Sequence, residues 1–201
     1  MTAEPDQLLQ EARGGDATIL GQLLEMYRRY LSLLARVQIG QRLQGKVDAE
    51  DLVQDTFLEA HRNFARFQGS TEGQFLCWLR KILAARLADM LRHYLGTQGR
   101  DVRLERELED AFDRSSVLLQ GGLIAQQSSP SQQAARREQA VLRADALGEL
   151  PEDYREVIVL RHLEALTFPQ VAQRMERSQD SVEKIWMRAL VRLRQLLGAN
   201  P

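Results

Sequence analysis

The clearest chemical pattern in this sequence lies near its C-terminal end, where polar and basic side chains alternate with apolar ones at helical spacing. From Val182 to Leu197, apolar residues recur every three or four positions, which indicates an amphipathic helix. The other face carries groups that can hydrogen-bond bases or bind phosphates: Gln179, Ser181, Glu183, Lys184, Arg188, Arg192 and Arg194. A helix with such a face can enter the major groove of DNA. The alternative is an ordinary helical hairpin with a solvated charged face.

A shorter helix and a tight turn precede this helix and must position it. Thr167 and Gln170 have the spacing of a capping box, and Pro169 falls in the first turn, where its missing N–H costs little. Glu176 and Arg177 follow as a break in the pattern, and Ser178 is a suitable N-cap for the second helix. The stretch 166–197 is therefore predicted to be a helix-turn-helix.

An acidic helix is predicted much earlier in the chain. Between Lys46 and Ala60 there are five acids and one base, a local net charge of −4. Asp51, Gln54 and Asp55 share one face of this helix, because residues three and four apart are neighbours. Acids also favour the start of a helix, so a solvated helix is one interpretation. Because the acids extend over more than one turn, we predict a docking surface for a basic protein partner.

A basic helix follows the acidic one after a polar loop, Gln68–Gln74. From Trp78 to Arg106 there are seven bases and three acids, a local net charge of +4. Basic groups track a phosphate backbone, and aromatic rings can stack on exposed bases. We expect Trp78 to lie in the core, whereas Phe67, at the edge of the loop, is the better candidate for stacking.

The composition predicts an all-α protein that works without a membrane or a disulfide. The chain has 201 residues, of which 44% are hydrophobic, and a net charge of −1. Leu and Ala dominate, which favours helices, and DNA binding would need local basic patches. The single cysteine, Cys77, excludes an internal disulfide and fits a reducing cytoplasm. We expect neither a signal peptide nor membrane insertion.

No residue pattern favours an enzyme. His61, His93 and His162 lack metal-ligand spacing with one another or with Cys77. The sequence also lacks a phosphate-binding glycine loop and a nucleophile elbow. We therefore expect no catalytic residue, no metal and no cofactor.

The order of these patterns predicts four segments. Residues 1–15 are a flexible N-terminus, and 16–95 form a helical bundle. Residues 96–135 are a polar linker with at most one short helix, and 136–198 form the helix-turn-helix domain. Within the bundle, one amphipathic helix is predicted from Ala17 to Val37, with its apolar stripe in the core.

Three segments of the chain, taken in order, resemble the sigma factors of bacterial RNA polymerase. These segments are DAEDLVQDTFLEAHRNF at Asp48–Phe64, FLCWLRKILAARLADMLRHY at Phe75–Tyr94, and Leu147–Leu197. They are similar to the family's core-binding helix, its promoter-melting and −10-recognising helix, and its −35-binding domain. The match is to the extracytoplasmic-function (ECF) type, which has only the second and fourth conserved sigma regions. The linker and C-terminal half look like an ECF subgroup abundant in planctomycetes.

The resemblance implies a transcription initiation factor whose partners are core RNA polymerase and promoter DNA. On the polymerase, it implies contacts to the β′ clamp helices and the β flap, and ECF sigma factors are often restrained by an anti-sigma factor. The positions that match the β′-binding residues are Asp51, Gln54 and Asp55. The positions in the loop that captures a flipped base are Phe67, Gln68, Ser70 and Thr71. Those expected to steady the phosphates are Arg80, Lys81, Arg86 and Arg92. Those expected at the −35 element are Arg177, Ser178, Gln179, Ser181, Lys184 and Arg188.

Four residues depart from the family pattern. Ala85 stands where the family usually has an Asn that helps form the base pocket. Glu176 and Ala165 each replace a common Gly, and Glu176 would be strained if its φ angle is positive. Glu183 falls where a base is frequent; a glutamate can accept from cytosine N4 but more often repels phosphate.

Two other classes of protein share some of these features. A stand-alone helix-turn-helix regulator with a helical sensor or dimerisation domain would have the same C-terminal half, but it leaves the acidic and basic helices without a role. A helical module that sequesters another transcription protein would bind no DNA.

Overall fold

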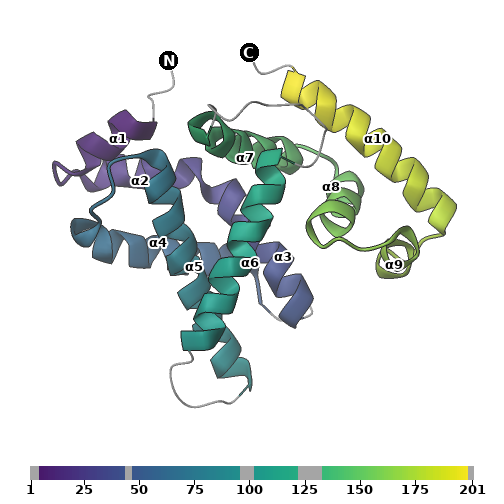
Figure 1. Ribbon diagram of the computed structural model, residues 1–201, viewed down its shortest axis with the longest axis horizontal. Coiled ribbons are helices and arrows are strands. Elements are labelled where there is room, and N and C mark those ends of the chain that lie inside the picture. Colours follow the sequence, from purple (N-terminus) through teal and green to yellow (C-terminus); the bar gives the residue numbers. More distant parts are fainter. Residues whose placement is uncertain (1–4, 44–46, 96–101, 122–132, 199–201) are drawn as a thin grey trace. The chain divides into compact units, whose positions relative to one another are not determined.

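The protein, described here by a computed structural model, is built from helices. The structure describes residues 5–43, 47–95, 102–121 and 133–198, and no strand occurs among them (Figure 1). The predicted all-α fold class is confirmed. The chain divides into two compact units, Met1–Arg114 and Ser115–Pro201, called here the N-terminal and C-terminal units.

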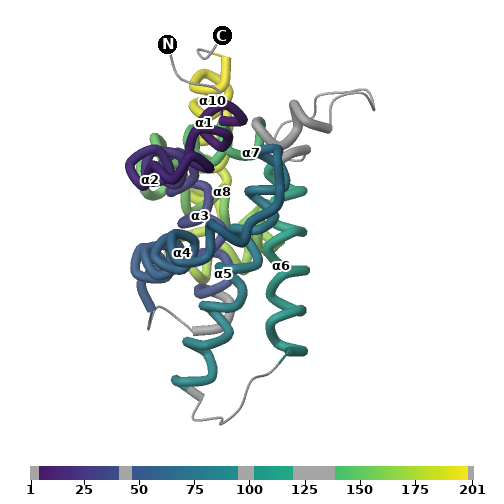
Figure 2. The backbone as a smooth tube through the Cα atoms, turned by 90° about the vertical axis from the view of Figure 1, so that its left-hand side faces the viewer, coloured from purple at the N-terminus to yellow at the C-terminus, as the bar shows by residue number. Residues whose placement is uncertain are grey.

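Six helices and the first part of a seventh build the N-terminal unit. They are α1 (Pro5–Ala12), α2 (Ala17–Met26), α3 (Arg28–Leu43), α4 (Ala49–Asn63), the 3-10 turn η1 (Phe64–Arg66), α5 (Glu72–Leu95) and the start of α6 (Val102–Gly121). Helix α4 packs against both α3 and α5, as the tube in Figure 2 shows. Asp16 and Asp48 cap α2 and α4, each accepting a backbone N–H two residues later, at 2.8 and 2.9 Å.

The apolar stripes found in the sequence form the core of this unit. Leu24, Leu31, Val53 and Leu83 are each at most 1% exposed. Tyr94, near the end of α5, lies outside this core and is 52% exposed. The single helix predicted from Ala17 to Val37 is two helices, because the chain breaks at Tyr27 between α2 and α3.

Two segments are more helical than the sequence patterns predicted. Residues 5–12 of the predicted flexible N-terminus form α1, because Leu8, Leu9 and Ala12 are buried against the rest of the unit. The predicted linker, 96–135, contains the 20-residue helix α6, which buries Leu108 and Phe112. The division between the two units falls inside this helix.

The C-terminal unit contains the end of α6 and the helices of the predicted helix-turn-helix domain. These are α7 (Gln133–Gly148), α8 (Glu152–Ile158), the π-helical turn η3 (Val159–Leu163), α9 (Phe168–Arg174) and α10 (Gln179–Gly198). Helix α10 packs on α7, α8 and α9. Its buried residues are Val182, Ala189 and Leu193, which confirms the face predicted to pack.

Candidate polymerase-binding and DNA-binding surfaces

Helix α4 displays its acids on the side opposite the core. Asp51, Gln54 and Asp55 are exposed, and the other face buries Leu52 and Val53 completely. Glu50 behaves differently, because it lies within ion-pair distance of α3, 3.9 Å from Arg28 and 3.5 Å from Arg36. The three residues predicted as a docking surface are thus brought together on one solvent-facing strip.

Leu58 also lies on this acidic strip and was not predicted from the sequence. Leu58 is 50% exposed and lies one turn after Gln54 and three residues after Asp55. The signal was present in the sequence, since an apolar residue at this spacing falls among polar ones. A strip that combines acids with an exposed leucine suits a partner surface that is basic at its edge and apolar at its centre.

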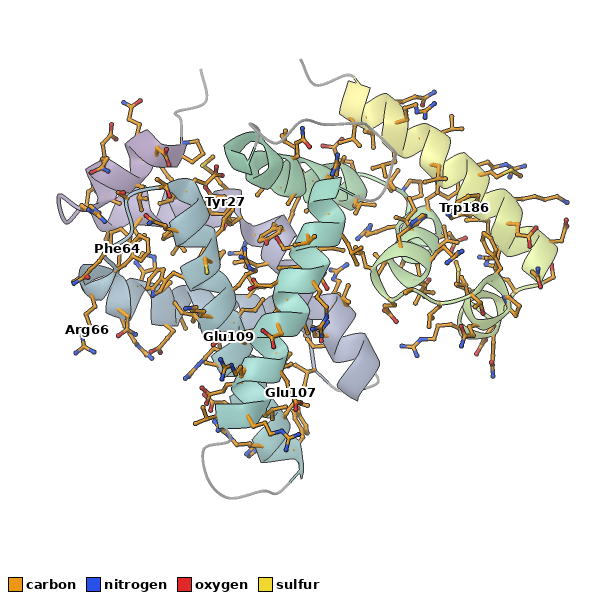
Figure 3. The ribbon with its side chains drawn as sticks, in the orientation of Figure 1. Tyr27, Phe64, Arg66, Glu107, Glu109 and Trp186 are labelled. Carbon is orange, nitrogen blue, oxygen red and sulfur yellow. The ribbon has the colours of Figure 1, made fainter. Side chains whose placement is uncertain are left out.

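The polar loop before α5 is built on a cluster of aromatic rings. Phe67 packs on Trp78, with ring centroids 4.9 Å apart, and on Phe64 and Phe75, at 6.1 and 5.6 Å. Phe67 and Trp78 are both half-buried, so part of each side chain is open to solvent. Trp78, which was expected in the core, is therefore packed in this cluster but is not among the fully buried residues. Figure 3 labels Phe64 in this cluster and shows the nearby Arg66 pointing outward.

Backbone hydrogen bonds hold this loop in one conformation. Thr71 and Gln74 form a capping box: Gln74 Oε1 accepts the backbone N–H of Thr71 at 3.3 Å, and Oγ1 of Thr71 accepts the backbone N–H of Gln74 at 3.4 Å. Gln74 Oε1 also accepts the backbone N–H of Ser70, at 2.7 Å. Gly69 is required for the close approach, because a Cβ there would lie 2.3 Å from Cζ of Phe67. Gln68, Ser70 and Thr71 remain exposed, so the loop presents polar groups beside the aromatic cluster.

The basic helix α5 is partly neutralised by acids of its own unit. Arg80 is only 15% exposed and donates to Asp113 of α6, at 2.7 Å, and to the hydroxyl of Tyr30, at 3.1 Å. Burial lowers the pKa of Arg80, but Tyr30 and Asp113 outweigh this effect, so the pKa is raised and the group stays charged.

The other bases of α5 differ in their surroundings. Arg92 is also 15% exposed, contacts Asp89 and lies 3.7 Å from Glu105 of α6. Arg86 pairs with Asp89 at 2.8 Å but is 36% exposed, and Lys81 is exposed. Of the four residues predicted to steady phosphates, Arg80 and Arg92 therefore pair with acids of α6, Lys81 is exposed, and Arg86 is half-buried.

Local hydrogen bonds cap the starts of α9 and α10 and close the turn between them. The predicted capping box of Thr167 and Gln170 is confirmed, and Ser178 accepts the N–H of Ser181 at 3.2 Å, as predicted for an N-cap. At the end of α9, the N–H of Arg177 bonds the carbonyl of Ala172 at 2.9 Å, and that of Glu176 bonds Gln173 at 3.3 Å. This pair of bonds is a Schellman motif, whose penultimate residue adopts a left-handed conformation.

Replacing Glu176 with glycine is expected to stabilise the C-terminal unit by about 0.5–1 kcal/mol. Glu176 has a φ of 53°, in the region where a side chain is strained and glycine is not. The free energy of unfolding rises by the strain that is relieved, less the cost of the larger conformational entropy that glycine has in the unfolded chain. Urea melts of both proteins measure it. Glu176→Ala removes the charge but keeps Cβ, so an equal gain in that variant would assign the effect to charge.

The residues predicted to contact the −35 element are placed around the start of α10. Arg177 pairs with Asp153 at 2.7 Å, and Lys184 pairs with Asp180 at 2.7 Å. Gln179 donates to Glu183 at 2.7 Å. The exposed members of the set are Arg177, Ser178, Gln179, Lys184 and Arg188, and Ser181 is half-buried. Exposed pairs of this kind contribute little stability, so a phosphate or base can replace the acid.

Further along α10 lies an exposed apolar strip that was not predicted from the sequence. Met187 and Val191 are 55% and 59% exposed. Together with Pro151 and Tyr154 they line a shallow groove of about 430 Å³, which Arg188 and Arg192 border. Met187 and Val191 are four residues apart and so share one face of the helix. The apolar residues of the buried face made this pattern hard to recognise in the sequence.

His162 and Trp186 join the π-helical turn to α10. The indole Nε1 of Trp186 donates to Nε2 of His162 at 3.0 Å, and the two rings stack with an interplanar angle of 18°. Burial, together with the neighbouring Arg161, lowers the pKa of His162. A neutral imidazole accepts this hydrogen bond, whereas a protonated one cannot.

The stability of the C-terminal unit is expected to fall as the pH drops below the unfolded-state pKa of His162, 6.5. Because the folded state has the lower pKa, it binds fewer protons than the unfolded state. The stabilisation is therefore fully present above pH 6.5 and is lost as the pH falls through the folded pKa. Thermal melts of a Trp78→Phe variant, which keeps Trp186, follow this unit by fluorescence.

A His162→Gln variant is the control for this pH dependence, because glutamine accepts the same hydrogen bond without titrating. Burial raises the pKa values of Glu156 and Glu164 in the same unit, and these groups act with the opposite sign. The difference between the two proteins isolates the histidine. Identical pH profiles would contradict the assignment.

No metal-binding group of three or more His, Cys, Asp or Glu residues occurs in the described part of the chain. Among the same residues, no helix is both long enough and apolar enough to cross a membrane.

Comparison with known proteins matches both units to conserved families. The family described as "Sigma-70 region 2" matches residues 26–94, and "Sigma-70, region 4" matches residues 144–193. The chain is 30% identical to the RNA polymerase sigma factor CnrH of Cupriavidus metallidurans, over 96% of this chain and 94% of that protein. It is 27% identical to the ECF RNA polymerase sigma-E factor of Haemophilus influenzae, over 84% and 82% of the two chains.

Among solved structures, the chain is similar to that of CnrH in complex with the cytosolic domain of CnrY. The two chains are 26% identical, the match covers 98% of each, and the TM-score is 0.34. With a score this low, the family assignment rests on the sequence matches. The likeness to a planctomycete subgroup stays a prediction.

Proposed function

This chain belongs to the sigma-70 family of bacterial RNA polymerase sigma factors and to its ECF type, and we propose that it performs each step of initiation with a separate surface. A factor of this family binds core polymerase, directs it to specific promoters and helps to open them. Such factors are non-enzymatic regulators, and we place this one in the cytoplasm with the polymerase. The observation that carries the assignment is the presence of both conserved regions in order on one chain.

Core polymerase binds the acidic strip of α4 in this proposal. Asp51, Gln54 and Asp55 are the contacts to the β′ clamp helices, a role supported by their joint exposure and shared charge. The C-terminal unit contacts the β flap. The contact of α4 with the clamp helices needs no rearrangement of α4, because the opposite face of this helix is the packed one.

The loop Phe67–Gln74 captures a base of the non-template strand at the −10 element. Its exposed polar groups on Gln68, Ser70 and Thr71 supply hydrogen bonds to the base edge. The rings beneath them, Phe67 and Trp78, supply a surface on which a base can stack. Ala85 adds no hydrogen bond to this site.

Phosphates near the −10 element are bound first by two bases of α5, the exposed Lys81 and the half-buried Arg86. Arg80 and Arg92 already serve acids of α6 and are largely buried. A contact between these two arginines and DNA would require α6 to release them. In the conformation described here, we assign them to holding α6.

The start of α10 reads the −35 element. Lys184 and Arg188 lie on its exposed face, while Arg177 and Ser178 lie at the turn, where they can bind phosphate. Gln179 and Ser181 complete the set. Glu183 sits among them and accepts from Gln179, so it shapes the preference of this helix for bases.

A regulatory protein partner is also part of the proposal. The relative CnrH is seen in a complex with the cytosolic domain of CnrY. By analogy with that relative, we propose that an anti-sigma factor binds this chain and restrains it.

Transcription in vitro with bacterial core polymerase tests the function as a whole. The template carries a randomised promoter region, and sequencing of the transcripts shows which templates were used. We expect transcripts only when the protein is present. The templates that were used should be enriched in particular sequences at two elements upstream of the start site, the −10 and the −35 element. The absence of both transcripts and binding to core polymerase would overturn the proposal.

The alternative of a stand-alone regulator makes a different prediction. It would bind duplex DNA as a dimer on a palindrome without polymerase. The region 2 match over residues 26–94 does not favour it.

A further inference from the structure

Helix α1 lies outside the segment that matches the sigma-70 region 2 family, which begins at residue 26. It is nevertheless firmly part of the N-terminal unit. Leu9 is fully buried, Leu8 and Ala12 are nearly so, and α1 packs on both α2 and α5. A helix anchored in this way can hold other parts of the unit in place.

The first contact of α1 with the base-capture loop is made by Asp6. Its Oδ1 accepts the backbone N–H of Glu72, the first residue of α5, at 2.6 Å. The first N–H groups of a helix have no partner within the helix. Asp6, 66 residues earlier in the chain, supplies an acceptor for the N–H of Glu72. This contact lies beside the capping box of Thr71 and Gln74.

Glu72 is also held by its side chain. Its carboxylate accepts the hydroxyl of Tyr27 at 3.0 Å, at the break between α2 and α3. Burial raises the pKa of Tyr27, and Glu72 adds to this effect, so the phenol remains a donor. Glu72, the residue at which α5 begins, is therefore fixed through both its backbone and its side chain.

The second contact of α1 with the loop comes from the residue just after the helix. The guanidinium of Arg13 donates to the carbonyl of Gly69. Gly69 is the residue that lies against the ring of Phe67 without room for a Cβ. The loop is thus held at two places, by Arg13 at the carbonyl of Gly69 and by Asp6 at the amide of Glu72. The exposed Ser70 and Thr71 lie between them.

We propose that Asp6 and Arg13 are positioning residues that preorganise the loop for capture of the −10 base. The inference rests on the proposed base-capturing function of that loop. Capture requires energy for unstacking a base, and a loop that is already ordered does not add its own ordering cost. The exposed groups of Ser70 and Thr71, which are proposed to read the base edge, lie between the two anchored backbone positions. By keeping these groups in one arrangement, Asp6 and Arg13 set how strictly the loop discriminates between bases.

Asp6→Ala and Arg13→Ala test the inference in the full chain with core polymerase and the randomised promoter library. Discrimination at the −10 position is expected to fall about fivefold for Asp6→Ala, the factor that corresponds to the free energy a helix cap usually contributes. The −35 preference and the affinity for core polymerase should be unchanged. Asp6→Asn, which keeps the accepting oxygen, is expected to restore discrimination, and Arg13→Lys to restore part of it.

Hydrogen exchange of the Glu72 amide provides a readout without DNA. Its exchange rate is expected to rise about fivefold in Asp6→Ala and to stay near that of the wild type in Asp6→Asn. A lower melting temperature with an unchanged −10 preference would show a merely structural role and overturn the inference.

A loop variant separates this inference from the function on which it rests. Gln68→Ala combined with Ser70→Ala removes exposed side chains and leaves the contacts of Asp6 and Arg13 with the backbone of the loop intact. If this variant alters the −10 preference but Asp6→Ala and Arg13→Ala do not, the positioning role is wrong and the loop function stands. If the loop variant alters nothing, the loop function itself is wrong.

Discussion

Replacing Asp51 and Asp55 with lysine is expected to weaken binding to core RNA polymerase by at least about 100-fold. Each reversal places a positive charge against the basic surface that the proposal assigns to the clamp helices. Like charges brought together at an interface cost several kcal/mol, and each 1.4 kcal/mol is about a tenfold change in affinity. Titration of labelled protein with core polymerase measures the loss.

The fold should survive this change. Both residues are exposed, and the face of α4 that packs is formed by other residues. Helix α4 loses the interaction of Asp51 with its N-terminal dipole, an effect of about 0.3–1 kcal/mol. A melting temperature within a few degrees of the wild type is therefore expected, as is normal for a change of this size.

A matched control applies the same change of charge elsewhere in the N-terminal unit. Glu107 and Asp110 of α6 are exposed acids at similar spacing (Figure 3 labels Glu107). Reversing both to lysine should leave affinity for the polymerase nearly unchanged. Equal losses in the two double variants would show that the overall charge of the unit matters, and an unaffected Asp51/Asp55 variant would remove α4 from the interface.

Replacing Lys184 and Arg188 with alanine is expected to weaken recognition of the −35 element. Each contact to a base edge contributes about 1–3 kcal/mol, and a contact to phosphate alone contributes less. The ion pair of Lys184 with Asp180 is exposed and spans one turn of the helix, so breaking it changes stability by only a few tenths of a kcal/mol.

The promoter library separates the two kinds of contact. Loss of a base contact relaxes the preference at one position of the −35 element. Loss of a phosphate contact weakens all promoters alike and reduces the salt dependence of binding. Arg194→Ala, an exposed base further along α10, is the matched control. An unaltered −35 preference in the Lys184/Arg188 variant would place recognition on another face of α10.

Features that depend on near neighbours in the chain were predictable from the sequence. The capping box of Thr167 and Gln170, the N-cap Ser178 and the buried face of α10 all involve residues within one or two turns of each other. The departures at Ala165 and Glu176 were found as unusual replacements of glycine. Both have positive φ angles, 57° and 53°.

Features that depend on tertiary packing were beyond the reach of these patterns. Arg80 was predicted to bind phosphate, yet its charge is taken up by Asp113, 33 residues away. Phe67 was predicted as a stacking ring at the loop edge, and the structure shows it supported by three other aromatic rings. Periodicity reports which face of a helix is polar but not which partner that face meets.

By itself, the sequence determined the all-α fold class, the acidic and basic helices and the helix-turn-helix, because charge, capping and helical periodicity are local properties. Only the tertiary structure decided which of the predicted residues are free to meet a partner. It assigned Arg80 and Arg92 to α6, left Lys81 in solvent and placed Asp6 on the amide of Glu72. These contacts join residues far apart in the chain, and they exist only once the helices have packed.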